Sequence, residues 1–346
     1  MLNLMKPHAL KRGDRVATVS LSWGGAGEPG LSYRYERGKH VLESVFGLEV
    51  IEMPHTLASP NEVYEHPEKR AQDLMDAFSD PEIKAIFSNI GGNDSIRMLP
   101  YIDYEVIKKN PKIFIGFSDS TITHLICLKA GIGSFYGPAI LTDFAETGGL
   151  MTYTKESVEQ SLFSNVPVGE VKPSSHWTSE RVDWFDPDCK NQPRTMYPNK
   201  FYEFLQGGQA VTGPLIGGCL DVLEIARGTS LFPEDECFDD AILFLETSEV
   251  QAPPWLIEDI FRNYAVRGIL KRLNGLVFAK PKGEVHYEAY KTPILKVLKE
   301  NNLESLPVLY NASFGHNEPK CVMPIGVRAK LDPINQRFSL IESGVQ

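Results

Sequence analysis

The stretch IFIGFSDS, residues 113–120, decides the fold of the first half of this chain. Its apolar run is typical of a buried strand, and it leads through Ser118 directly into the helical pattern of residues 121–130. Gly116 lies two positions before the serine and the small Ser120 two positions after it, which is close to the pattern of a nucleophile elbow. Such a turn exposes a serine hydroxyl and presents the next backbone N–H to an oxyanion. The pattern departs from Gly-x-Ser-x-Gly at Ser120, and the alternative role for this turn is simple capping of the helix.

The segments around this stretch alternate short apolar runs with helical patterns. We expect strands at 15–20, 48–53, 83–90 and 112–117, helices at 35–46, 67–78 and 121–130, and residues 135–141 to complete this half. Alternation of this kind is typical of βα units that build a mostly parallel sheet. The sequence therefore predicts an α/β fold with a doubly wound first domain.

The middle of the chain has a different character. Residues 167–202 are rich in Pro, Ser, Asn, Lys and Asp, contain Trp177 and Trp184, and show little periodicity. We interpret them as a long linker with local structure, and ordered loops of this length are often functional. Beyond it we expect strands at 241–246, 275–279 and from 307, one long helix at 256–272, and a helix at 292–301. The predicted domains are therefore 1–166, a linker segment 167–205, and 206–346.

Composition excludes several classes of protein. The 346 residues carry a net charge of −10, which disfavours a nucleic-acid polymer as partner because phosphate binding needs clustered positive charge. The five cysteines are dispersed without a CxxC pair, which favours reduced thiols and offers no zinc-site spacing. The N-terminus has no signal-peptide pattern, and no apolar run approaches the ~20 residues that a membrane helix needs. We therefore expect a soluble, cytoplasmic protein with no membrane partner.

A second turn of interest is the Gly91–Gly92 pair, which follows the apolar run 83–90. Paired glycines let a backbone approach a ligand closely and present N–H groups to it, as an oxyanion hole requires. The alternative is an ordinary turn between a strand and a helix.

A serine nucleophile needs a base, and the base needs an orienting carboxylate. Of the eight histidines, most lie in polar or helical surroundings that suggest surface positions, whereas His316 follows an apolar strand start on a loop. Glu246 ends the apolar run AILFLE and is a candidate acid, with Glu249 three residues later as its rival. Sequence spacing does not decide between these two glutamates.

These residues fall within segments that resemble the LD-carboxypeptidase family of serine peptidases, and most closely its microcin-immunity branch. The matching segments, in order, are RGDRVATVSLS, RAQDLMDAFSDPEIKAIFSNIGGNDSIRMLPYIDY, KIFIGFSDSTITHL, TGPLIGGCLDVLEIARGTS, AILFLETSE and GHNEPKCVMPIGVRAKLD. They extend over nearly the whole chain, and their order is more specific than any single segment.

The resemblance implies an N-terminal α/β domain with a nucleophile elbow and a C-terminal β-rich α/β domain that supplies the glutamate and the histidine. It implies Ser118, Glu246 and His316 as catalytic residues, placed at the domain interface, often within a homodimer. It also implies an oxyanion hole formed by backbone N–H groups near Gly92 and at Asp119. Cys219 departs from the asparagine of many relatives, which leaves the substrate contacts of its turn open.

The implied chemistry is amide hydrolysis through an acyl-enzyme, with no metal or organic cofactor. Microcin-immunity relatives cleave the amide between a C-terminal aspartate and a modified nucleotide, whereas LD-carboxypeptidases release D-alanine from a murein tetrapeptide. The long aromatic segment favours the first substrate, with Gly91, Trp177 and Trp184 as substrate-binding candidates, although both tryptophans have hydrophobic packing as an alternative role. Base stacking on an aromatic ring contributes ~1–3 kcal/mol. More distant alternatives are an α/β-hydrolase esterase and a non-catalytic binding protein.

Overall fold

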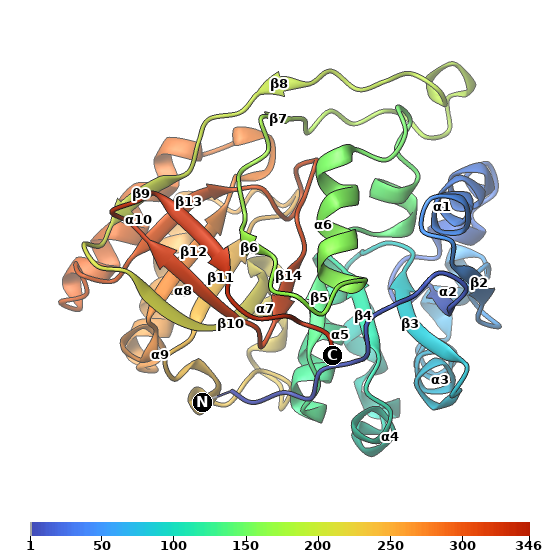
Figure 1. The fold of residues 1–346 in the computed structure, drawn as a ribbon, viewed down its shortest axis with the longest axis horizontal. Helices are drawn as coiled ribbons and strands as arrows, with labels where there is room; N and C mark the ends of the chain where they lie inside the picture. Colours follow the sequence, from blue (N-terminus) through green and yellow to red (C-terminus); the bar gives the residue numbers. More distant parts are fainter. Residues whose placement is uncertain (1) are drawn as a thin grey trace.

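Two β-sheets organise the α/β fold seen in the computed structural model, which describes residues 2–346 (Figure 1). The first sheet and its helices form one side of the molecule, and the second sheet and its helices form the other. This architecture confirms the predicted combination of an N-terminal parallel-sheet domain with a second, β-rich α/β part. No helix within residues 2–346 has the length and apolar character needed to cross a membrane.

The first sheet has the strand order β14-β5-β4-β3-β1-β2, in which β1 to β5 run parallel and β14 pairs antiparallel with β5. Its strands are β1 (Arg15–Val19), β2 (Glu49–Glu52), β3 (Ile83–Ser88), β4 (Ile113–Gly116), β5 (Ser134–Tyr136) and β14 (Met323–Ile325). The strand order reverses at β1 and β3. In open parallel sheets, ligands bind in the crevice beyond the carboxyl ends of the strands at such a reversal.

Six α-helices accompany this sheet in the described chain: α1 (Ser32–Ser44), α2 (Pro60–Glu65), α3 (Pro67–Ser79), α4 (Tyr104–Lys109), α5 (Thr121–Ala130) and α6 (Thr152–Leu162). Every residue of β4 is buried, and so is almost all of α5, because this unit lies in the middle of the molecule. Gly131, with a φ of +83°, ends α5 in a left-handed conformation that glycine adopts without strain. The sequence prediction for this unit is confirmed.

The second sheet has the order β6-β16-β15-β10-β11-β12-β13-β9. Its strands are β6 (Gly169–Glu170), β9 (Glu203–Gln206), β10 (Val211–Cys219), β11 (Ile242–Glu246), β12 (Gly275–Ala279), β13 (Val308–Ala312), β15 (Arg328–Asp332) and β16 (Arg337–Leu340). The four central strands β10 to β13 run parallel and the outer pairs run antiparallel. The carboxyl ends of β11 and β13 therefore lie at the same edge.

The helices of this half are α7 (Leu220–Ala226), α8 (Pro254–Val266), α9 (Ile269–Arg272) and α10 (Tyr287–Glu300). The single long helix predicted at 256–272 is wrong, because Gly268 between α8 and α9 has a φ of +81° and interrupts it. The helix predicted at 292–301 begins earlier, at Tyr287. Short 3₁₀ turns cover Gly25–Gly27, Ser95–Tyr101, Ser118–Ser120, Pro187–Cys189, Asp235–Phe238 and Lys282–Glu284, and a π-helical turn covers Ile140–Phe144.

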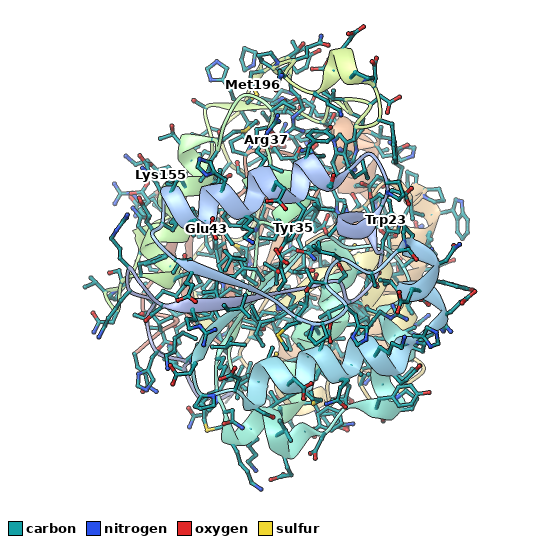
Figure 2. The ribbon with its side chains drawn as sticks, turned by 90° about the vertical axis from the view of Figure 1, so that its right-hand side faces the viewer. Trp23, Tyr35, Arg37, Glu43, Lys155 and Met196 are labelled. Carbon is teal, nitrogen blue, oxygen red and sulfur yellow. The ribbon has the colours of Figure 1, made fainter. Side chains whose placement is uncertain are left out.

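The segment 167–205, predicted to be a linker with local structure, contributes β6 and most of β9 to the second sheet. It includes β7 (His176–Trp177) and β8 (Tyr197–Pro198), which pair with each other. Between β7 and β8 the chain runs towards α1 and back (Figure 1). Arg37 of α1 points towards the segment that carries Met196 (Figure 2) and donates hydrogen bonds to the carbonyl oxygen of Lys190. The segment is therefore fastened to the first half, while the domain boundaries at 166 and 206 stay predictions.

Candidate active site

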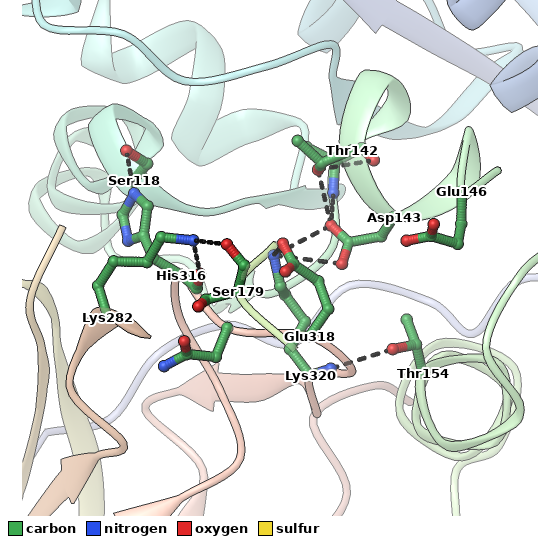
Figure 3. Close-up of polar contacts among 12 residues, drawn as sticks. Ser118, Thr142, Asp143, Glu146, Thr154, Ser179, Lys282, His316, Glu318 and Lys320 are labelled. Atoms are coloured by element: carbon green, nitrogen blue, oxygen red, sulfur yellow. Dashed lines mark hydrogen bonds and ion pairs between the residues drawn. The ribbon is translucent and has the colours of Figure 1, made fainter. Parts of the chain in front are cut away.

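Ser118, His316 and Glu246 meet where the two sheets adjoin. Ser118 follows β4, Glu246 is the last residue of β11, and His316 lies on the loop after β13. The Ser118 Oγ lies 3.0 Å from His316 Nε2, and His316 Nδ1 lies 2.7 Å from Glu246 Oε2. Figure 3 shows the serine hydroxyl directed at the imidazole. The three side chains therefore form a continuous chain of hydrogen bonds, in the order of nucleophile, base and orienting acid that a catalytic triad requires.

The backbone at Ser118 has the conformation of an elbow. Its φ is +62°, a region that a residue with a side chain occupies only when its surroundings hold it there. The Ser118 N–H donates to Tyr136 Oη at 2.9 Å, and Thr121 Oγ1 donates to the Ser118 carbonyl oxygen at 2.7 Å. The N-cap residue of α5 is Ser120, and neither Ser118 nor Asp119 caps that helix with its side chain. The geometry therefore favours the elbow over helix capping.

Gly116 is required by the close packing below the elbow. A Cβ atom at this position would lie 2.6 Å from Ser120 Oγ and 2.7 Å from Ser88 Cβ. His124 of α5 also packs here, with Nε2 2.9 Å from the Gly116 carbonyl oxygen and Nδ1 2.9 Å from Ser134 Oγ. His124 is fully buried, and burial lowers its pKa to about 4. Most of the other histidines are exposed or half-buried, as expected, and His124 is the exception among them because its ring fills this space under the turn.

Glu246 is buried, and its carboxylate has two partners. Oε2 contacts His316 and Oε1 accepts a hydrogen bond from Tyr136 Oη. Burial opposes ionisation of this carboxyl, but the charge of His316 and the hydrogen bonds from His316 and Tyr136 outweigh it and lower the pKa of Glu246. Tyr136, which sequence analysis did not identify, thus links the elbow to the acid.

Glu249 takes a different position from Glu246. Its carboxylate lies 3.2 Å from His316 Nε2, on the nucleophile's side of the ring, and its side chain is 51% exposed. Only Glu246 contacts Nδ1, the nitrogen that an orienting acid must hold. The geometry therefore supports Glu246 as the triad acid.

The Gly91–Gly92 turn lies directly over the nucleophile. A Cβ atom on Gly91 would lie 2.8 Å from Ser118 Cβ, and one on Gly92, whose φ is +150°, would lie 2.3 Å from Ser22 Oγ. The Gly92 N–H has no hydrogen-bond partner within residues 2–346. Asp119 orients this turn, since its carboxylate accepts hydrogen bonds from Ser22 Oγ at 2.5 Å and from two backbone N–H groups, those of Asp94 at 3.0 Å and Ser95 at 2.8 Å. Backbone donors are thus available beside the hydroxyl.

A cavity of about 490 Å³ opens in front of the serine, and both halves of the chain contribute to its wall. The lining includes Trp23, Gly91, Gly92, Arg181, Asp221, Glu249 and Glu318. Trp23 follows β1 at the strand-order reversal, and sequence analysis did not single it out, although its place after a parallel strand was a usable signal. A cavity of this volume accommodates a ligand the size of a nucleotide or a short peptide.

The two tryptophans predicted to bind substrate lie outside this cavity, as residues 2–346 define it. Trp177 packs against Tyr197, with ring centroids 6.0 Å apart, and beneath the Lys280 ammonium. Trp184 is half-buried, with the Arg34 guanidinium 4.1 Å from its ring centroid, and its carbonyl oxygen accepts a hydrogen bond from Tyr33 Oη. The contacts of both rings in the free protein are therefore packing contacts.

A cluster of buried charges lies behind His316 (Figure 3). Lys320 pairs with Asp143 at 3.2 Å and with Glu318 at 3.5 Å, and its ammonium lies 3.4 Å from the centroid of the Phe117 ring. Burial opposes ionisation of Glu318, but Lys320 and Arg194 outweigh it and lower its pKa to about 2. These residues come from four distant segments, so no sequence pattern could have identified them.

Residues at this cluster also hold His316 in place. Lys282 Nζ donates to the His316 carbonyl oxygen at 3.0 Å, and the Phe117 ring meets the His316 ring edge-on with centroids 5.1 Å apart. Arg194 of the segment before β8 bridges Glu146 and Glu318. The histidine is thereby fixed between the two halves of the chain.

Three potential metal ligands, Cys219, Glu246 and His316, lie within 4.8 Å of one another. Burial raises the pKa of the Cys219 thiol well above its ordinary value. A metal held there would have to separate Glu246 from His316 Nδ1. The donor set therefore fits the triad better than a metal centre.

Two long segments of the chain match the two domains of one protein family. Residues 16–137 match the LD-carboxypeptidase N-terminal domain, and residues 212–331 match the LD-carboxypeptidase C-terminal domain. A putative carboxypeptidase of Vibrio cholerae is 31% identical over 98% of this chain and 98% of its own length.

Two solved structures are similar to this one over nearly their whole length. An MccF-like protein from Streptococcus pneumoniae in complex with AMP has a TM-score of 0.86 and 33% identity, covering 94% of this chain and 98% of its own. The microcin C7 self-immunity protein MccF, known from Escherichia coli, in complex with aspartyl sulfamoyl adenosine, has a TM-score of 0.85 and 26% identity, covering 99% of this chain and 100% of its own. Related proteins thus bind a nucleotide and an aminoacyl nucleoside analogue.

Proposed function

This chain belongs to the LD-carboxypeptidase family, and we propose that it hydrolyses the amide bond beside a C-terminal residue through an acyl-enzyme formed on Ser118. The main support for the proposal is the chain of hydrogen bonds that runs from Ser118 through His316 to Glu246, with Ser118 at a strained elbow. The family is one of serine hydrolases, and this arrangement provides the groups that such a reaction needs.

The proposed reaction has two steps. His316 Nε2 takes the proton of Ser118 as Oγ attacks the carbonyl carbon, and the oxyanion that forms is stabilised by the N–H groups of Gly92 and Asp119. His316 then returns this proton to the leaving nitrogen, and the C–N bond breaks. Water attacks the acyl-enzyme with His316 again as base, which releases the acid and restores the serine hydroxyl. Glu246 holds His316 in the required tautomer throughout.

For the substrate we propose an aminoacyl or peptidyl nucleotide. Relatives of this chain bind AMP and aspartyl sulfamoyl adenosine, and the cavity volume suits a ligand of that size. The alternative, release of D-alanine from a murein tetrapeptide, is supported by the family to which the chain belongs. The predicted homodimer stays a prediction.

Hydrolysis of aspartyl sulfamoyl adenosine measured beside that of a murein tetrapeptide tests this choice. We expect kcat/KM for the nucleoside substrate to exceed that for the tetrapeptide by about 10-fold or more, since a cavity shaped for one ligand discriminates to at least that degree. Release of adenosine sulfamate and of D-alanine is followed by chromatography. Turnover of the tetrapeptide alone would support the alternative, and turnover of neither would reject both.

We also propose that Trp184 stacks on the base of the nucleotide, and Trp184→Ala tests this role. We expect KM for aspartyl sulfamoyl adenosine to rise about 5- to 150-fold, the range that loss of one base stack of ~1–3 kcal/mol produces, with little change for the tetrapeptide. KM on both substrates and the melting temperature are measured together. Trp255→Ala is a matched control, because Trp255 is 64% exposed on α8.

The packing role of Trp184 leads to a different result. Its ring contacts Arg34 and adjoins the core of the first half, so a structural role predicts equal losses on both substrates together with a lower melting temperature. That outcome would contradict the stacking proposal.

A further inference from the structure

Arg181 and Glu249 form an ion pair across the cavity in front of the nucleophile. Arg181 lies on the segment between β7 and β8, and Glu249 lies on the loop after β11, so the pair joins two distant parts of the chain. Both residues line the cavity, and their side chains are 52% and 51% exposed. Neither side chain is packed into a core, so each is free to move when a ligand enters.

The Glu249 carboxylate occupies a position that the reaction needs. It lies 3.2 Å from His316 Nε2, the same nitrogen that lies 3.0 Å from Ser118 Oγ. In acyl transfer by a serine triad, this nitrogen delivers its proton to the leaving group. Glu249 therefore lies where the leaving group must come, and a bound substrate has to displace it.

Displacement of Glu249 leaves Arg181 without its counterion. Among the described residues that line the cavity, Arg181 is the only lysine or arginine. The other lining carboxylates are already engaged: Asp221 accepts hydrogen bonds from Ser248 N and Oγ, and Glu318 pairs with Lys320 and Arg194. A guanidinium that loses a carboxylate is best satisfied by another anion of similar geometry.

We propose that Arg181 receives an anionic group carried by the leaving group, and that Glu249 takes the place of this anion in the free enzyme. This inference rests on the proposed function and specifies which substrates its site accepts. The shared chemistry is an oxyanion close to the scissile nitrogen, which is either the terminal carboxylate of a released amino acid or the phosphate of a released nucleotide. A leaving group without such a charge would have to displace Glu249 without forming a new ion pair with Arg181.

The test compares anionic with neutral ligands in Arg181→Gln, Glu249→Gln and a control variant. One arm measures binding of AMP and of adenosine by calorimetry, and the other measures hydrolysis of a tetrapeptide ending in D-alanine and of its D-alaninamide form. Arg262→Gln is the control, since Arg262 is 46% exposed on α8 and pairs with Glu258 and Glu300.

We expect Arg181→Gln to reduce the preference for the anionic ligand by about 10-fold or more, through Kd or KM rather than kcat. Glu249→Gln is expected to shift the same preference in the opposite direction, because it removes a negative charge that repels an anion in this cavity. The arm in which these changes occur identifies the anion as a phosphate or a terminal carboxylate. Arg262→Gln should leave both preferences as they are.

Two results would overturn the inference. One is a wild-type protein with no preference for the anion in either arm, and the other is an Arg181→Gln variant that loses anionic and neutral ligands equally. The binding arm requires no turnover, so its outcome is independent of the proposed reaction. A protein that hydrolyses no substrate but retains an Arg181-dependent preference for AMP would reject the proposed hydrolysis and support the anion site.

Discussion

Ser118→Ala is expected to lower kcat by about 10³-fold or more while the protein stays folded. The hydroxyl is the proposed nucleophile, and without it no acyl-enzyme forms. Its hydrogen bond is with His316 Nε2, at the wall of an open cavity, so its removal leaves no hole in the core. Turnover of the preferred substrate, the melting temperature and the circular dichroism spectrum of the variant measure these effects.

A nearby serine provides the control. Ser120 is buried two residues later and donates a hydrogen bond to Ser88 Oγ at 3.1 Å, away from His316. Ser120→Ala is expected to cost about 1 kcal/mol of stability, the usual contribution of one hydrogen bond, and to keep most of the activity. Near-normal turnover by a folded Ser118→Ala protein would remove Ser118 from the mechanism.

Glu246→Gln is expected to reduce kcat by about 10⁴-fold, the loss that the change from carboxylate to amide causes in a well-studied serine triad. A glutamine can present its NH₂ group to His316 Nδ1, which favours the tautomer that cannot act as base towards Ser118. Its amide also replaces the carboxylate that accepts the hydrogen bond from Tyr136. Single-turnover measurements separate this loss in the chemical step from any change in binding.

Glu249→Gln is the matched comparison, because Glu249 also contacts His316 but at Nε2. Its effect on kcat is expected to be small, since no carboxylate is needed on that side of the ring during proton transfer. If Glu249→Gln were the more damaging change, the orienting acid would have to be reassigned to Glu249.

The unit around IFIGFSDS could be predicted from sequence because its determinants are local. The apolar run of β4, the glycine that ends α5 and the helical spacing between them all act over a few residues. The error at residues 256–272 has the same origin. A glycine inside a helical pattern is compatible with a continuous helix or with a break, and Gly268 adopts the left-handed conformation that breaks it.

The site could be predicted only in part. His316 is 198 residues from Ser118 in sequence, so its pairing with the serine was implied by the family resemblance and not by spacing. Arg181 lies in an aperiodic segment where no pattern distinguishes one charged side chain from another. The buried pairing of Lys320 with Asp143 arises only when the two halves are packed together.

Each half of the molecule contributes a strand to the sheet of the other half, and this limits how the two halves can separate. β6, which precedes Arg181 in sequence, pairs in the second sheet, whereas β14, which follows it by more than a hundred residues, pairs in the first. A protease that nicks the exposed backbone near residue 183 would therefore produce two fragments that stay interlocked, each completing the other's sheet. Swinging the halves apart as rigid bodies would require unpairing β14 from β5. Access of a substrate to Ser118 therefore depends on side chains and short loops at the rim of the cavity.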